Sequence, residues 1–386
     1  MKMKVLFVQY EANMWGTSKS LLTIIDGLLA QGHTAAVCLA QPGSLQDELC
    51  RRDVSVEVVP QYPWLISVHT PAWRRATACL KHALVTPSCR ALDFCRGFLP
   101  DLIHTNTIKT TLGAWLARRT RVPHIWHVRS YPSGRHSLNM SLTWGNRLSQ
   151  RYMWSRSDHR VFISDSLRRH FRNALDDPQS SVIYNGVCSV DDIAATCAPP
   201  ETHGFRLLFV GRIDAFKDPF IAVQAIAALK RHGLHGSLRI VGTGAEDMLA
   251  RLTSCIKEYD VSDRVDFVGY LNDPFQALRE ADVLVMPSRY DAFGRVIAEA
   301  MAAGTVPIVA DSPVNHELIC HGTDGLIFSP HTPEALAQQI LHLVQDREQY
   351  RKLAMNAIQK ARSQFTTERY VAYLLNLYEA VRSKAA

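Results

Sequence analysis

The sequence lacks several features that define other protein classes. No uninterrupted apolar run is long enough to span a bilayer, which argues against an integral membrane protein. The nine cysteines are scattered without a C-x-x-C pair or metal-ligand spacing, so we expect mostly core thiols in a reducing cytoplasm. Neither half carries a complete G-x-G-x-x-G with a downstream acid, which disfavours a nicotinamide-dependent dehydrogenase.

What the chain does contain fits a two-domain globular enzyme. It has 386 residues, of which 47% are apolar and 20% charged, so one ordinary core is too small for it. The basic start and the apolar run 5–8 resemble a signal peptide, but the run is broken by Glu11. We therefore expect the first core strand there.

Charge is unevenly divided between the two halves. Residues 1–200 carry 23 Lys and Arg against 14 Asp and Glu, whereas residues 201–386 carry 20 against 22. A basic first half suggests an anionic partner, such as lipid headgroups or a phosphate-bearing acceptor, and no nucleic acid is expected. The alternative is that the arginines simply solvate surface helices.

Strand-like and helix-like runs alternate along the whole chain. Strands are expected at 5–8, 35–39, 54–59, 102–104, 124–127, 160–163, 207–210, 237–241, 265–268, 283–286, 306–310 and 326–328. Helices are expected near 18–31, 73–97, 108–120, 139–156, 217–232, 245–259, 273–280 and 295–303. The pattern predicts an α/β protein with two Rossmann-like doubly wound domains facing across a cleft. We place the first domain at 1–187, a linker at 188–204, the second domain at 205–365 and a C-terminal helix at 366–386, which we expect to cross back to the first domain.

The segment 288–304, SRYDAFGRVIAEAMAAG, carries the strongest chemical signal. It follows a run typical of a buried parallel strand, and residues 295–303 read as a helix that ends at Gly304. A strand, a glycine turn and a helix start form a natural anion site, because free amides and the helix dipole point at the ligand. Asp291 and Glu299 beside such a site are expected to bind hydroxyl groups or to meet positive charge.

Two further strand ends carry glycines. Gly211 follows the first strand of the second half, and Arg212 and Lys217 supply positive charge for a phosphate there, although both could be ordinary surface residues. Gly242 opens a G-x-G turn that by itself marks only a tight strand-to-helix connection.

Together these segments resemble the retaining nucleotide-sugar glycosyltransferases of glycosyltransferase family 4, which have the two-domain GT-B fold. The matching segments are NGV at 185–187, FVGR at 209–212, GTG at 242–244, VDFVG at 265–269, FG at 293–294, EA at 299–300, GTVP at 304–307 and GL at 325–326. The family's E-x7-E pair appears here as Asp291 and Glu299, with a shorter first acid. The likeness is tight over 185–330 and looser before.

The resemblance implies a donor site in the second domain. Arg212 and Lys217 would hold the diphosphate and offset its charge as it leaves, with Gly211 and Gly242 nearby. Asp291 would bind a sugar hydroxyl, as the family's first glutamate does.

The helix start after the glycine turn completes this implied site. Backbone amides near Phe293, Gly294 and Arg295 would bind the same phosphates, and Glu299 would accept hydrogen bonds from the ribose hydroxyls. The alternative for Glu299 is a buried pair with an arginine. No D-x-D motif is present to hold a metal on the diphosphate, so we expect transfer without metal or cofactor.

The first domain should bind the acceptor. Gly16 lies in the loop after the first strand, near the donor phosphate, and Trp15 stands where the family usually has another glycine. Asn106 occupies the position of an active-site histidine in some members. His127 could contact donor sugar or acceptor, or be structural, and Arg129 could grip an acceptor phosphate.

Mixed basic and apolar residues at 71–100 suggest a peripheral contact at the inner face of the membrane, or else an ordinary surface helix. We therefore expect a cytoplasmic retaining glycosyltransferase of hexosyltransferase type. It would move a sugar from a nucleotide-diphosphate donor to a glycan or lipid-linked acceptor, in surface polysaccharide or glycoconjugate synthesis. The alternative is a catalytically weak GT-B-like binding or scaffold protein. A sugar epimerase or phosphorylase of the same fold ranks lower.

Overall fold

The computed structural model describes residues 2–14, 16–84, 89–132, 140–171, 174–197, 204–329 and 331–385. The chain forms two compact units, each treated by itself below. Unit 1 comprises Met1–Gly186 with Thr367–Ala386, and unit 2 comprises Val187–Thr366. In the described ranges, no helix combines the length and the apolar character needed to cross a membrane.

Unit 1 is built on a parallel sheet of seven strands in the order β3-β2-β1-β5-β6-β8-β9. These strands are β1 (Lys4–Gln9), β2 (Thr34–Leu39), β3 (Ser55–Val58), β5 (Leu102–Thr105), β6 (His124–Val128), β8 (His159–Phe162) and β9 (Ser180–Val182). A separate antiparallel pair joins β4 (Leu65–Ser67) to β7 (Met140–Leu142). Its helices are α1 (Gly16–Ala30), α2 (Ser44–Cys50), α3 (Ala72–Leu84), α4 (Cys89–Phe98), α5 (Leu112–Thr120), α6 (Gly145–Ser155), α7 (Asp165–Arg169) and α15 (Thr367–Ala385).

Unit 2 has six parallel strands in the order β12-β11-β10-β13-β14-β15. These are β10 (Phe205–Val210), β11 (Gly236–Val241), β12 (Val265–Gly269), β13 (Val283–Met286), β14 (Val306–Ala310) and β15 (Leu326–Phe328). Its helices are α8 (Pro219–Arg231), α9 (Glu246–Glu258), α10 (Phe275–Glu280), α11 (Arg295–Ala303), α12 (Pro313–Leu318), α13 (Pro333–Gln345) and α14 (Arg347–Gln364). In both units the strand order reverses beside the first strand, which is the switch point where doubly wound folds bind ligands.

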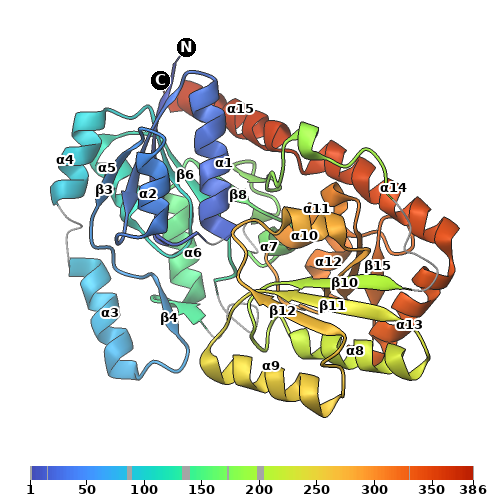
Figure 1. Ribbon diagram of the computed structural model, residues 1–386. Coiled ribbons are helices and arrows are strands. Elements are labelled where there is room, and N and C mark those ends of the chain that lie inside the picture. The colour runs from blue at the N-terminus through green and yellow to red at the C-terminus, as the bar shows by residue number, and fades with distance from the viewer. Residues whose placement is uncertain are drawn as a thin grey trace. The chain divides into compact units, whose positions relative to one another are not determined.

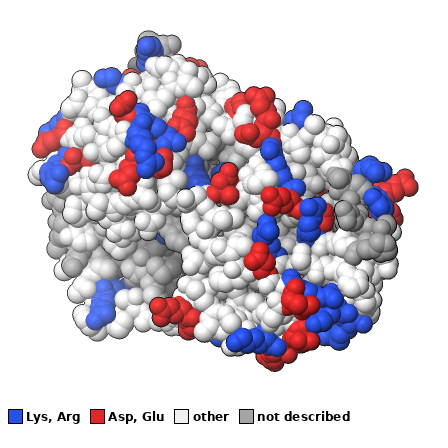
Figure 2. Space-filling view, in the orientation of Figure 1, with Lys and Arg blue, Asp and Glu red and all other residues white. Residues whose placement is uncertain are grey.

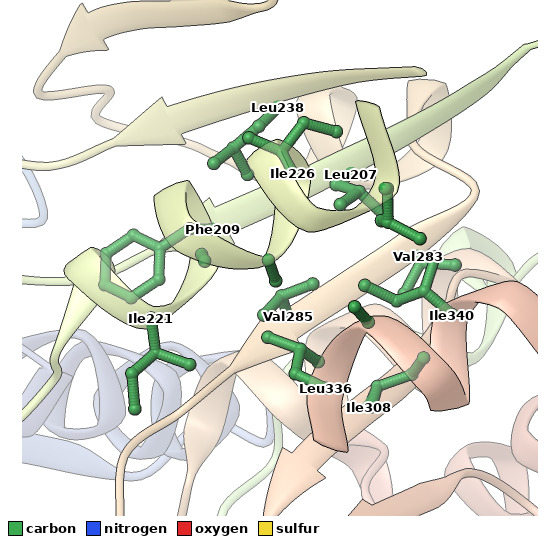
Figure 3. Close-up of a cluster of buried hydrophobic side chains, with 14 of the residues drawn as sticks. Leu207, Phe209, Ile221, Ile226, Leu238, Val283, Val285, Ile308, Leu336 and Ile340 are labelled. Carbon is green, nitrogen blue, oxygen red and sulfur yellow. The ribbon is translucent and has the colours of Figure 1, made fainter. Parts of the chain in front are cut away.

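Local sequence explains where many of these elements begin. The hydroxyls of Ser312 and Thr332 accept hydrogen bonds from backbone N–H groups in the first turns of α12 and α13, and a proline follows each cap. Parallel strands covered on both faces need apolar side chains throughout, and β13 and β14 are buried at every residue. The core of unit 2 packs Phe209 and Val285 of the sheet against Ile226 of α8 and Ile340 of α13 (Figure 3).

The C-terminal helix α15 belongs to unit 1, where it lies beside α1 (Figure 1). Their close approach depends on Gly27, because a Cβ atom there would lie 2.4 Å from Cγ2 of Val371. Tyr370 and Tyr378 of this helix are buried in the same core as β1 and α1.

Some expected boundaries differ from the structure. The single helix expected near 73–97 contains two helices, α3 and α4. The expected linker 188–204 belongs to unit 2 where it is described: a 3-10 turn spans Val190–Asp192, and the N–H of Ala194 donates to the carbonyl of Ala302. The strands β4, β7 and β9 and the helices α2, α7, α12, α13 and α14 were not predicted.

Candidate functional site

The expected donor residues of unit 2 lie at the carboxyl ends of three neighbouring strands. Gly211 follows β10, Gly242 follows β11, and the segment with Asp291 follows β13. Because carboxyl ends of parallel strands meet at one edge, these segments form one site beside the switch point. The two glycine loops touch: Gly242 has φ 153°, and a Cβ there would lie 1.8 Å from the carbonyl oxygen of Gly211. No side chain larger than hydrogen fits at Gly242.

Lys217 and Asp291 form an ion pair at this edge. The Lys217 Nζ donates to Asp291 Oδ1 at 2.5 Å, and the two side chains are only 20% and 14% exposed. The second carboxylate oxygen of Asp291 is buried and has no hydrogen-bond partner in the described structure. Asp291 therefore keeps one acceptor oxygen available while its other oxygen is held by Lys217.

Arg212 is held less tightly. Its Nη2 lies 2.9 Å from Asp214 Oδ2, and its side chain is 45% exposed. The other oxygen of Asp214 accepts hydrogen bonds from the backbone N–H groups of Phe216 and Lys217. Asp214 therefore shapes the loop that presents both cations.

The turn after β13 orients the acidic helix α11. Gly294 has φ 78° and precedes the first helical residue, Arg295. The Arg295 Nε donates to Glu299 Oε1 at 2.7 Å, and its Nη2 donates to the carbonyl of Val187 at 3.2 Å. Glu299 is 8% exposed, so the arginine pair that the sequence left as an alternative is present. Phe293 is buried and packs edge-on against Phe365.

The expected acceptor residues of unit 1 form a buried cluster at the ends of β5 and β6. His104, Asn106 and His127 have no exposed surface, and Arg129 is 5% exposed. Arg129 Nε donates to Asn106 Oδ1 at 2.6 Å, and its Nη1 donates to Asn185 Oδ1 at 2.7 Å.

The second terminal nitrogen of Arg129, Nη2, donates to the hydroxyl of Tyr370 at 2.6 Å and lies 3.3 Å from His127 Nδ1. Four side chains thus occupy the guanidinium that we expected to grip an acceptor phosphate, and that role stays a prediction. None of these four partners is a carboxylate.

The two histidines continue this cluster. His104 Nε2 lies 3.2 Å from His127 Nδ1, and His104 Nδ1 lies 2.7 Å from the hydroxyl of Tyr378. Burial, together with the charge of Arg129, lowers the pKa of both imidazoles well below the ordinary histidine value, so both rings are neutral near pH 7. His127 Nε2 is buried and lacks a hydrogen-bond partner in the described structure.

Asn106 links the end of β1 to the first turn of α1. Its Nδ2 donates to Gln9 Oε1 at 2.9 Å and to the carbonyl of Thr17 at 3.3 Å. Gly16 begins α1 and would have open space around a Cβ, whereas Trp15 lies outside the described residues.

Sequence reasoning missed the two tyrosines that complete the cluster. The last helix itself was expected, but nothing in its sequence distinguished Tyr370 and Tyr378 from ordinary core residues. Their partners lie 241 and 274 residues away along the chain. In the part of the chain that is described, no group of three His, Cys, Asp or Glu side chains could hold a metal ion.

Two family models match the chain. Residues 16–186 match the glycosyl transferase 4-like domain, and residues 199–360 match glycosyl transferases group 1. Glycogen synthase of Mycobacterium tuberculosis is 25% identical over 98% of this chain and 95% of its own. D-inositol 3-phosphate glycosyltransferase of Jonesia denitrificans is 29% identical over 56% of this chain and 55% of its own.

Solved structures share the same two-unit architecture. Anabaena Alr3699/HepE in complex with UDP and glucose has a TM-score of 0.78 at 21% identity, covering 98% of this chain and 100% of its own. Sucrose-phosphate synthase from Thermosynechococcus elongatus has a TM-score of 0.75 at 17% identity, covering 99% and 100%. With the family matches and the parallel-sheet topology, these likenesses lead to one conclusion. The chain belongs to the GT-B glycosyltransferases of the GT4 type.

Proposed function

We propose that this glycosyltransferase takes a sugar from a nucleotide-diphosphate donor bound in unit 2 and transfers it with retention to a glycan or lipid-linked acceptor. The observation that carries the proposal is the ion pair of Lys217 with Asp291, which joins the loop after β10 to the segment after β13. Arg212 lies in the first of these loops, and Glu299 lies on the helix that follows the second. The fold neighbour Alr3699/HepE is a complex with UDP and glucose, which supports the nucleotide-sugar class.

Each of these side chains has a role that its chemistry allows. Lys217 and Arg212 bind the diphosphate and stabilise the charge that develops as it leaves, a task that fixed cations perform without a metal. The open oxygen of Asp291 accepts a hydrogen bond from a sugar hydroxyl, and Glu299 accepts hydrogen bonds from the ribose. Retention follows, in this proposal, from departure and attack on one face, with the leaving phosphate taking the acceptor proton.

Nucleotide binding tests the donor site directly. Thermal unfolding with UDP, GDP, ADP and their glucose conjugates, in the presence of EDTA, should show a stabilising shift for one base, because a ligand that binds only the native state raises apparent stability. Lys217→Ala and Glu299→Ala should abolish the shift, whereas Lys230→Ala, whose Nζ pairs with exposed acids on the same unit, should keep it. If no nucleotide raises the unfolding temperature of the folded protein, the result favours the scaffold alternative. A stabilising shift that requires Mg²⁺ would contradict metal-independent binding.

The acceptor side includes a proposed contact with anionic membrane at the inner face. Helix α3 exposes Trp73 at 64% and Leu80 at 57%, and the guanidinium of Arg74 lies 5.0 Å from the centre of the Trp73 ring. An exposed apolar and basic helix of this kind suits a membrane interface. Elsewhere, on the face in Figure 2, basic and acidic side chains are interspersed.

Sedimentation with lipid vesicles separates the membrane contact from an ordinary surface helix. The protein should sediment with phosphatidylglycerol vesicles more than with phosphatidylcholine vesicles, and added salt should weaken binding by screening. Trp73→Ala with Leu80→Ala should reduce sedimentation, while Tyr373→Ala, an exposed aromatic of α15, should not. Equal sedimentation with both lipids, or none, contradicts the membrane proposal and leaves the donor site untouched.

A further inference from the structure

The buried cluster of unit 1 contains a line of hydrogen bonds whose direction can be worked out atom by atom. It runs from the hydroxyl of Tyr378 to His104 Nδ1, and from His104 Nε2 to His127 Nδ1. A neutral imidazole has one N–H donor and one bare nitrogen, so fixing one ring nitrogen fixes the other. Two proton orders would satisfy these contacts, one the reverse of the other. In the first, Tyr378 donates to His104 and His104 donates to His127. In the second, His127 donates to His104 and His104 donates to the hydroxyl of Tyr378.

Arg129 decides between the two orders. A guanidinium has five N–H donors, no acceptor, and keeps its charge in proteins. Its Nη2 lies 3.3 Å from His127 Nδ1, the same nitrogen that faces His104. A proton on Nδ1 would point toward a cation and leave that N–H without an acceptor on the arginine. The bare lone pair of Nδ1 instead receives hydrogen bonds from Arg129 and from His104.

The rest of the cluster holds Arg129 where it can do this. Its Nε and Nη1 are fixed by the amide oxygens of Asn106 and Asn185 at 2.6 and 2.7 Å, and its Nη2 also by the Tyr370 hydroxyl. All these partners are neutral, so none of them cancels the charge that faces His127. The same charge, after burial, lowers the pKa of the His127 imidazole, which keeps the ring neutral. Burial raises the pKa of Tyr378 well above its ordinary value, so its phenol keeps the proton that it donates.

We infer that Arg129 is a positioning residue that holds neutral His127 with its proton on Nε2, so that this histidine offers a hydrogen-bond donor and not a base. The fully buried Nε2–H has no partner in the described structure, and an unpaired buried donor costs about 1–3 kcal/mol, so its place calls for an acceptor. The acceptor we assign is an oxygen of the bound sugar substrate, hydroxyl or phosphate. This last step rests on the proposed function, whereas the proton order does not.

Nitrogen NMR of ligand-free protein tests the proton order. Protonated and bare imidazole nitrogens have well-separated ¹⁵N shifts, and a His127→Asn variant identifies the ring among the 16 histidines. We expect the His127 proton on Nε2 and a bare Nδ1. A proton on Nδ1 overturns the inference, whatever the protein does with nucleotides.

Variants of Arg129 test whether this arginine determines which nitrogen of His127 carries the proton. In Arg129→Gln the side chain can accept a hydrogen bond, so the His127 proton should appear on Nδ1 in a large part of the molecules; Arg129→Lys, which only donates, should restore Nε2–H. Tyr370→Phe removes a different partner of Arg129 and should leave Nε2–H in place. An unchanged tautomer in folded Arg129→Gln overturns the role of Arg129. If that variant does not fold, loss of the Nε2 proton in folded Arg129→Lys overturns it instead.

Substrate binding is read in a separate measurement. UDP-glucose should shift the His127 Nε2 resonance with the proton still on Nε2, and UDP alone should shift it less. Loss of that proton on binding overturns the donor role. If none of the UDP, GDP and ADP sugars stabilises the protein, the proposed function fails, and the ligand-free spectrum still decides the proton order.

Discussion

Neutralising Asp291 separates the two roles proposed for its carboxylate. In this structure the carboxylate holds Lys217 at 2.5 Å, so the diphosphate of the proposed donor would share or displace that contact. Asp291→Asn keeps the shape of the side chain but removes its charge, leaving Lys217 unopposed. We therefore expect UDP to bind more tightly to the variant than to the wild type. Transfer from the sugar nucleotide should nevertheless slow, because the proposed hydroxyl acceptor is weakened.

The size of the UDP effect follows from the burial of the ion pair. Fully exposed pairs contribute about 0.2–1 kcal/mol, and breaking a buried pair costs about 3–5 kcal/mol. The side chains of Lys217 and Asp291, at 20% and 14% exposed, lie between these limits. An intermediate value of about 1–2 kcal/mol corresponds to roughly a 5–30-fold lower Kd for UDP. The loss in kcat/KM should be on the order of tenfold or more, as expected when a charged hydrogen-bond acceptor is removed.

Isothermal titration calorimetry with UDP, paired with transfer assays, measures both effects. Asp260→Asn is the matched control, because Asp260 pairs with Lys230 and its side chain is 96% exposed. UDP affinity in this control should match the wild type. Weaker or unchanged UDP binding in Asp291→Asn would refute the idea that Asp291 competes with the diphosphate for Lys217.

Three further substitutions test separate parts of the structure. Gly242→Ala should lower UDP affinity at least tenfold and destabilise unit 2 by about 2 kcal/mol or more, since its methyl group would lie 1.8 Å from the Gly211 carbonyl oxygen; calorimetry and denaturant unfolding measure both. His124 is buried, and burial lowers its pKa to about 4, so the unfolded chain binds the extra proton between pH 6.5 and 4. The contribution of His124 to stability should therefore be complete above pH 6.5 and fall by about 3 kcal/mol toward pH 4, in addition to the losses from His104 and His127. His124→Gln should reduce the total acid slope by this amount in urea unfolding at several pH values. Tyr378→Phe should cost about 1–2 kcal/mol of unfolding free energy, because His104 Nδ1 loses its buried donor.

Each of these changes has a matched control in the same chain. Gly233→Ala places a methyl group in open space at positive φ, so its cost should stay at about 1–2 kcal/mol and UDP binding should be normal. His232→Gln is exposed and should leave the acid slope unchanged. Tyr373→Phe, 47% exposed on α15, should be nearly neutral. If Gly242→Ala is as stable as the wild type, the argument from crowding at Gly242 is wrong. An unchanged acid slope in His124→Gln would contradict the lowered pKa of His124. Equal losses of unfolding free energy for Tyr378→Phe and Tyr373→Phe would contradict a stabilising hydrogen bond at Tyr378.

The sequence predicted the strands of the two sheets more reliably than it predicted which side chains contact each other. The strands of unit 2 were recognisable because buried parallel strands are short runs of apolar residues, and the predicted 283–286, 306–310 and 326–328 agree with β13, β14 and β15. Edge strands and polar helices gave weaker signals: β9 is only partly buried, and α14 has a long polar face. These elements depend on tertiary packing that local pattern does not record.

The sequence indicated the partner of a charged side chain only where the two residues lie close together along the chain. Arg295 and Glu299 are four residues apart on one helix, so their pair could be anticipated as an alternative. The burial of Arg129 could not, because it is created by Asn185 and by Tyr370 from distant segments. An arginine at a strand end looks the same in sequence whether it faces solvent or a buried ring of amides and hydroxyls.

The return of α15 to unit 1 has a consequence for biosynthesis. As the chain leaves the ribosome, residues 1–186 emerge before unit 2, yet the helix that covers their core around Gly27 and supplies Tyr370 and Tyr378 is made after unit 2. Unit 1 therefore waits, with an apolar face and the guanidinium of Arg129 incompletely paired, while all of unit 2 is synthesised. Unit 2, continuous from Val187 to Thr366, can fold ahead of it. Unit 1 can therefore complete its core only after unit 2 has been synthesised, although its sheet precedes unit 2 in the sequence.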